Sequence, residues 1–268
     1  AVNGVYGGIR DMVEMAQRFD FELTTNYIAG LWRLSGHVMS LNYNTCLNIL
    51  DKVLDNKFEV ILVSHEVWGL FSKSLAEKIL SQVEQGTGLI LCSPGQLPEA
   101  LEPYLSAHPK KHSCRGQWQA VSDHPLLSGL PFAALPPTQA RCYQTSGEVL
   151  ARIDQFPLLS AFKYGQGQVY ALSYLVSKPN VRKEDTSLQS SFFLPLLTYD
   201  PPEVEYKYYE YQMALLGRLL YAAAGRSSNV SAGKLTAAPG NCQVELQAVQ
   251  NQTAQLEITL RDKFSQVV

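Results

Sequence analysis

Five residues that could do chemistry together each come at the end of a short apolar run. His65 and Glu66 follow one run, Cys92 and Ser93 lie at the end of a second, and Tyr174 ends a third. The carboxyl ends of parallel strands meet at one edge of an open α/β sheet, and such folds bind ligands there. The sequence therefore predicts a small-molecule crevice lined by these residues, with a polar rim that only caps helix starts as the alternative.

The segments that must position these residues are two buried strands and the helices around them. Residues 58–63 and 89–92 are short, nearly continuous apolar runs, typical of strands buried on both faces. Residues 46–54 and 70–83 repeat apolar side chains at helical spacing. Because a helix between parallel strands requires a right-handed crossover, we predict an α/β fold: an open, wound, mostly parallel sheet with helices on both faces.

The rest of the chain completes this prediction. A helix is expected over 9–19, a strand over 20–28, and a long helix over about 203–224. Residues 158–162 and 168–174 are predicted as strands joined by a glycine turn. The proline-rich segment 104–160 predicts short strands and loops.

The end of the chain differs in character from the part before it. We predict an α/β domain over 1–226, a small-residue linker over 227–234 and a β segment over 235–268. The last segment alternates apolar and polar residues, but two strands cannot hold a core of their own. It is expected to be the start of a truncated β-sandwich or a hairpin docked on the main domain. The chain begins without Met, and we expect a fragment of a longer protein.

Composition excludes several classes of protein. The 268 residues are 46% apolar and 17% charged, with a net charge of −2, so we expect no binding of nucleic acid, which favours basic domains. No apolar run approaches the ~18 residues that a membrane span needs. The five Cys are widely spaced with no Cys-x-x-Cys pair, which argues against a disulfide framework or a zinc site. We predict no metal and no cofactor.

Several segments, taken in their order along the chain, resemble a known family. They are residues 58–63, 83–91, 124–131, 156–169 and 211–226. Together, over roughly 45–226, they resemble the class I glutamine amidotransferase-like superfamily. The resemblance is to its non-amidotransferase branch, which includes the trimerisation domain of some β-galactosidases and trehalose-utilisation-like domains of bacterial multidomain proteins. The resemblance implies an amidotransferase-like, flavodoxin-like sheet.

The catalytic residues of that superfamily are not matched. Its amidotransferases carry a nucleophilic Cys on a sharp turn with Gly two residues before and after, and a late His-Pro-Glu supplies the base. Here Cys92 has Ile90 and Pro94 at those positions, and Ser93 has only Gly95 after it. No late His-Pro-Glu occurs. A thiol without a base stays mostly protonated near pH 7. We therefore predict a non-catalytic structural, oligomerisation or ligand-sensing module of a larger bacterial protein, linked to carbohydrate metabolism.

Two other functions stay open as alternatives. One is a hydrolase or amidotransferase-like enzyme that uses Cys92 or Ser93 with help from His65. The other is a glycan-binding module, because aromatic faces stack on sugar rings. The residues expected to do so form a tyrosine cluster: Tyr199, Tyr206, Tyr208, Tyr209 and Tyr211.

One cluster of metal-ligand types also needs an explanation. His108, His112 and Cys114 are close in sequence, but the adjacent Lys110 and Lys111 repel a cation, so we predict a solvated basic loop. The expected partners are neighbouring domains of the same longer chain, a second copy in a homo-oligomer, and a carbohydrate or small-molecule ligand. The sequence does not determine the compartment; an extracytoplasmic bacterial location, periplasmic or secreted, is our expectation.

Overall fold

The chain forms two compact units, residues 1–226 and 227–268. The computed structural model describes residues 2–3, 8–19, 21–24, 26–27, 43–92, 96–121, 123–131, 138–173, 202–226, 230–238 and 241–248. The statements below concern these residues.

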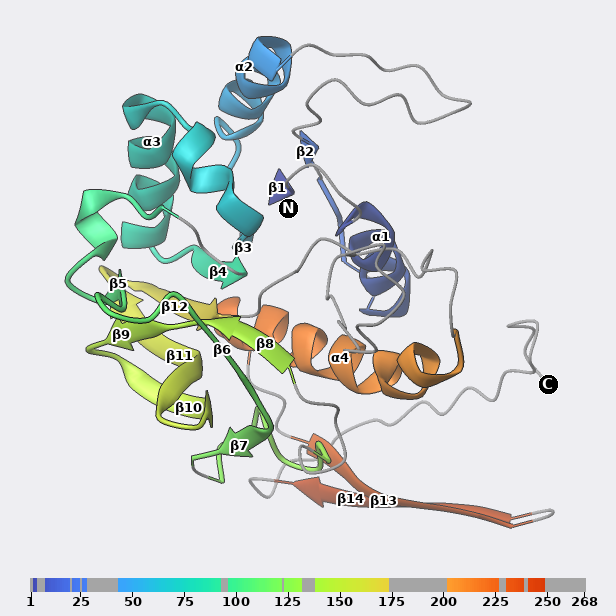
Figure 1. Ribbon diagram of the computed structural model, residues 1–268. Helices are drawn as coiled ribbons and strands as arrows, with labels where there is room; N and C mark the ends of the chain where they lie inside the picture. Colours follow the sequence, from blue (N-terminus) through green and yellow to red (C-terminus); the bar gives the residue numbers. More distant parts are fainter. Residues whose placement is uncertain are drawn as a thin grey trace. The chain divides into compact units, whose positions relative to one another are not determined.

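The first unit is built on one sheet of eight strands in the order β2-β1-β3-β4-β12-β11-β10-β7 (Figure 1). In that order the strands span Asn26–Tyr27, Val2–Asn3, Val60–Ser64, Gly88–Cys92, Gly167–Leu172, Phe156–Tyr164, Glu148–Ile153 and Trp118–Ala120. All pairings from β2 to β12 are parallel, and all pairings from β12 to β7 are antiparallel. The expected parallel strands are confirmed, but the sheet as a whole is mixed. The reason is that a tight turn joins β11 to β12, and a tight turn can only connect antiparallel strands.

Helices cover both faces of this sheet, as predicted. Helices α1 (Gly8–Phe19) and α4 (Pro202–Ala223) contribute to one buried core, which we call the first core. Helices α2 (Tyr43–Val53) and α3 (Lys73–Glu84) contribute to another, the second core. Figure 1 shows α4 and α3 on different sides of the central strands.

Alternate side chains of the central strands belong to the two different cores. Leu62, Ile90 and Leu172 belong to the first core, whereas the flanking Val63 and Leu91 belong to the second. Successive side chains of a strand point to opposite faces of a sheet, so a strand with a helix on each side must be apolar at every position. This explains why 58–63 and 89–92 lack a polar–apolar alternation.

The predicted strand over 20–28 is confirmed only in part. Residues 21–24 are not in a strand, Asn26–Tyr27 pairs with β1, and residues 20, 25 and 28 lie outside the described residues. Phe21 and Leu23 pack against the first core instead. Residues of types that favour strands therefore pack against the core here and do not pair with another strand. Local propensity does not distinguish these two roles.

The segment predicted as short strands and loops is confirmed as such. It contains two small antiparallel sheets, and the 3-10 helix η2 (Glu99–Leu101) precedes it. One pairs β5 (Leu105–Ala107) with β9 (Tyr143–Thr145), and the other pairs β6 (Ser113–Gly116) with β8 (Thr138–Arg141).

Polar side chains fix the start of β3 against α3 and β4. Gln82 donates from Nε2 to the carbonyl oxygens of Leu54 at 2.7 Å and Asn56 at 3.0 Å. The buried Thr87 hydroxyl donates to the carbonyl of Phe58 at 2.7 Å. These bonds satisfy backbone groups that would otherwise be buried without partners.

The segment 124–131, part of the family resemblance, is held by an arginine of α4. Arg218 donates from Nη1 to the carbonyl oxygens of Leu126 at 3.2 Å and Ser128 at 2.5 Å. Burial lowers the pKa of the Arg218 guanidinium. The buried side chains of Leu126 and Leu127 enter the first core. The segment is therefore anchored on α4.

The second unit contains an antiparallel pair, β13 (Val230–Ala238) and β14 (Asn241–Ala248). The first strand begins within the segment predicted as a linker, and residues 249–268 of the predicted β segment lie outside the described residues. Across the described parts of both units, no helix has the length and apolar character required to cross a membrane.

Candidate functional site

The carboxyl ends of three neighbouring strands form one row. Ser64, the last residue of β3, is paired with Cys92, the last residue of β4, and Cys92 is paired with Leu172 of β12. The row continues through Ser173, whose carbonyl accepts a hydrogen bond from the backbone N–H of Arg141 at 2.9 Å. This is the edge at which open α/β sheets bind ligands, so it is the candidate site.

Cys92 has the position of a nucleophile but not its surroundings. Its side chain belongs to the first core and is only 2% exposed. Burial raises the pKa of the Cys92 thiol well above its ordinary value, because a thiolate loses its solvation in an apolar core. At neutral pH the sulfur is therefore protonated and shielded from a substrate in water.

The other predicted site residues are only partly placed. The backbone of His65 and Glu66 opens the 3-10 helix η1 (His65–Leu70), directly after the row of strand ends, but their side chains lie outside the described residues. Ser93 and Tyr174 also lie outside the described residues. A crevice that joins these four side chains to Cys92 stays a prediction.

The residues near Cys114 do not form a metal site. His112 is exposed and Cys114 is buried, while the His108 ring packs edge-on against Phe156 with the ring centroids 5.3 Å apart. Within the described part of the chain, no three His, Cys, Asp or Glu side chains are grouped so as to hold a metal ion. Lys110 is exposed, as expected for a basic loop.

The tyrosine cluster is represented by one described side chain. Tyr211 is 40% exposed on α4, and the side chains of the other four tyrosines lie outside the described residues. The glycan-binding alternative therefore stays a prediction. The buried tryptophans Trp68 and Trp118 are core residues, not surface platforms.

The structure adds polar groups to this edge that sequence reasoning missed. Trp68 of η1 and Tyr143 of β9 are buried in the second core, and neither the Trp68 Nε1 nor the Tyr143 hydroxyl has a hydrogen-bond partner among the described residues. Burial raises the pKa of Tyr143, and the positive charge of nearby Arg141 opposes that rise. Local sequence gave no signal for this group, because Arg141 and Tyr143 reach the edge only through long-range pairing.

Comparison with known proteins assigns neither a family nor an activity to this chain. No family model matches the chain, and no curated protein matches its sequence. Among solved structures, a cytoplasmic protein of Salmonella typhimurium is 15% identical with a TM-score of 0.47, covering 80% of this chain and 86% of that one. A ThuA-like protein from Parabacteroides merdae is 12% identical with a TM-score of 0.43, covering 91% and 96%. A β-galactosidase from Bacillus circulans sp. alkalophilus is 12% identical with a TM-score of 0.40, covering 84% of this chain and 28% of that one. These values are too low to assign an activity.

Proposed function

We propose that the first unit is a non-catalytic module of the amidotransferase-like type, which packs or binds a ligand within a larger bacterial protein. One observation carries the proposal: the thiol at the position of the superfamily's nucleophile is buried in the first core. A nucleophilic cysteine must be exposed to its substrate and must be largely ionised or paired with a base. Cys92 is 2% exposed and burial raises its pKa, so both properties oppose catalysis.

The proposal predicts that Cys92 is inert in the folded protein. With iodoacetamide at pH 7, we expect Cys92 to be alkylated at least about a hundredfold more slowly than in denaturant, because burial blocks access and suppresses the thiolate. Peptide mass spectrometry at Cys92 over a time course measures the rate. The substitution His65→Ala serves as the matched test and should leave that rate unchanged. Fast labelling that His65→Ala slows would instead support the enzyme alternative.

The link to carbohydrate metabolism is part of the proposal and rests on the sequence resemblance. The neighbouring domains of the full-length gene product would test it directly. Flanking glycoside-processing domains would support the link, and flanking domains from an unrelated process would remove it.

A second candidate function, binding of a small anion, is favoured by the group around Tyr143. Arg141 supplies a positive charge, and its Nε is buried. The Tyr143 hydroxyl is buried without a partner among the described residues, and the backbone of nearby Arg141 reaches the ligand edge of the sheet. A buried unpaired hydroxyl costs about 1–3 kcal/mol, which a ligand oxygen would recover. A carboxylate or phosphate suits a guanidinium and a hydroxyl donor. The hydroxyl is enclosed, so binding requires local opening.

The substitution Tyr143→Phe tests whether the hydroxyl is unpaired in the folded protein and whether it binds an anion. We expect Tyr143→Phe to leave the free energy of unfolding unchanged or to raise it by about 1 kcal/mol, because no described hydrogen bond is lost. Urea unfolding measures this. The control Tyr221→Phe removes a hydroxyl that donates to the Phe19 carbonyl at 3.3 Å and should slightly lower stability.

If inorganic phosphate raises Tm relative to chloride at equal ionic strength, Tyr143→Phe should abolish the effect. A loss of more than about 1 kcal/mol in Tyr143→Phe would show that the hydroxyl already has a partner.

A further inference from the structure

Two cysteines far apart in the sequence lie together beside β6. Cys114 is in β6, opposite Ala140 of β8. Cys142 follows β8, and its backbone N–H donates to the carbonyl of His112 at 3.1 Å. Cys142 is therefore the diagonal neighbour of Cys114, and in an antiparallel pair diagonal neighbours project from the same face.

The two thiols lie side by side inside the first core. Both side chains belong to that core, with Cys114 6% exposed and Cys142 2% exposed. The Cys114 Sγ donates to the carbonyl oxygen of Ala140 at 3.8 Å, and the neighbouring Cys142 contributes to raising the pKa of the Cys114 thiol. Both cysteines are free in this structure. Their register and shared burial therefore place them as candidates for a disulfide.

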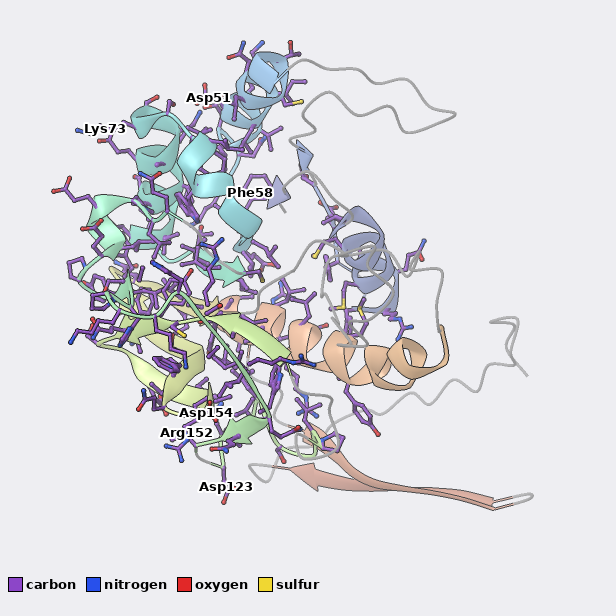
Figure 2. The ribbon with its side chains drawn as sticks, viewed as in Figure 1. Asp51, Phe58, Lys73, Asp123, Arg152 and Asp154 are labelled. Atoms are coloured by element: carbon purple, nitrogen blue, oxygen red, sulfur yellow. The ribbon has the colours of Figure 1, made fainter. Side chains whose placement is uncertain are left out.

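Two neighbouring thiols could serve a metal or form a bond with each other. The described residues offer no third His, Cys, Asp or Glu ligand grouped with them, so a metal ion would lack a coordination shell. The charged groups that act on Cys114 are Lys111 and Asp154, with opposite effects on its ionisation. Figure 2 shows Asp154 at the outer end of β10, and it occupies the β10–β11 turn. Because no third ligand is grouped with the two thiols among the described residues, a bond between the two sulfurs is favoured over metal binding.

We propose that Cys114 and Cys142 form an oxidation site at which a peroxide converts the two thiols into an intramolecular disulfide. The Cys114 thiolate attacks one peroxide oxygen, the O–O bond breaks, and the hydroxide that leaves takes up the thiol proton as water. The Cys142 thiol then attacks the resulting sulfenic sulfur, the S–S bond forms, and a second water leaves. Two thiols are oxidised and one peroxide is reduced to two waters.

Local changes are enough for this reaction. Both thiols are buried, so peroxide reaches them only when the core opens locally. The two side chains are diagonal neighbours on one face, and side-chain rotation with small backbone adjustment can bring the sulfurs to the ~2.05 Å of a disulfide. The pair sits on a two-stranded sheet of four residue pairs, not on the central eight-stranded sheet. Burial raises the pKa of Cys114 to about 12, so the reaction is expected to be slow at neutral pH.

The full chain, with its five cysteines, is the protein to test. After exposure to hydrogen peroxide and removal of the excess, non-reducing digestion and mass spectrometry should reveal one peptide pair joining Cys114 to Cys142, lighter by two hydrogen atoms. The thiol count measured in denaturant should fall from five to three. The oxidised protein should also melt roughly 5–10 °C higher, reversed by dithiothreitol, because the crosslink restricts the unfolded chain.

Matched variants make the result specific. Cys142→Ser should abolish the crosslinked peptide and the rise in Tm, whereas Cys46→Ser, at a buried cysteine outside the pair, should retain both. If Cys142→Ser does not fold, the peptide map of the unaltered chain still shows whether the disulfide between Cys114 and Cys142 forms. Retention of all five thiols, oxidation of Cys114 to its sulfinic acid without a crosslink, or a disulfide between other cysteines would each overturn the proposal.

Discussion

Gly88→Ala is expected to lower the free energy of unfolding by about 3 kcal/mol or more. A Cβ at position 88 would overlap the backbone carbonyl and Cβ of Ala223, near the end of α4. Backbone cannot rotate away as a side chain can, so either β4 or α4 must shift. Because β4 lies between β3 and β12, such a shift disturbs the centre of the sheet. Urea unfolding followed by circular dichroism measures the loss.

The matched control is the same substitution at an open position. At Gly69 the nearest atom to an added Cβ is the Gln96 Oε1 at 3.4 Å, which is ordinary contact with the end of a flexible side chain. Gly69→Ala should change stability by less than about 0.5 kcal/mol. Equal effects of Gly88→Ala and Gly69→Ala would mean that α4 does not pack on the start of β4.

Ile90→Ala is expected to cost about 3–5 kcal/mol. Ile90 is 0% exposed in the middle of β4, and its side chain belongs to the first core. Truncation removes buried apolar contacts and leaves a cavity that two neighbouring strands and the covering helices cannot easily fill. The midpoint and slope of urea unfolding give the change, and an unchanged slope would show that the fold is kept.

The same chemical change at the surface provides the comparison. Ile49 of α2 is 41% exposed, so Ile49→Ala should alter stability by less than about 1 kcal/mol. If Ile90→Ala were as mild as Ile49→Ala, β4 would not be a central buried strand. The parallel β3–β4 pairing on which the fold assignment rests would then be wrong.

The secondary structure was predicted best where a local sequence pattern is typical of one kind of element. Residues 60–63 and 89–92 are apolar at successive positions, as is typical of a strand covered on both faces, and β3 and β4 are parallel neighbours. The helices α1, α3 and α4 lie close to their predicted bounds for the same reason. Ser72 caps the start of α3, where its hydroxyl accepts a hydrogen bond from the Leu75 N–H at 3.2 Å.

Within 104–160 the sequence predicted short strands but could not pair them. Partners such as Cys114 and Ala140 are distant in the chain, and single short strands carry too little pattern to fix a register. For that reason the contact between Cys114 and Cys142 was missed. So was the approach of the Arg141 backbone to the carboxyl end of β12.

From the residues alone we could predict the parallel strands with helices on both faces, and the position of Cys92 at the end of a strand without glycines two residues before and after it. The burial of this sulfur in an apolar core, and the position of Cys142 as diagonal neighbour of Cys114, became apparent only from the folded chain. The physical reason is that periodicity and local propensity act over a few residues. Burial, pKa and side-chain contact depend instead on which distant segments fold against one another.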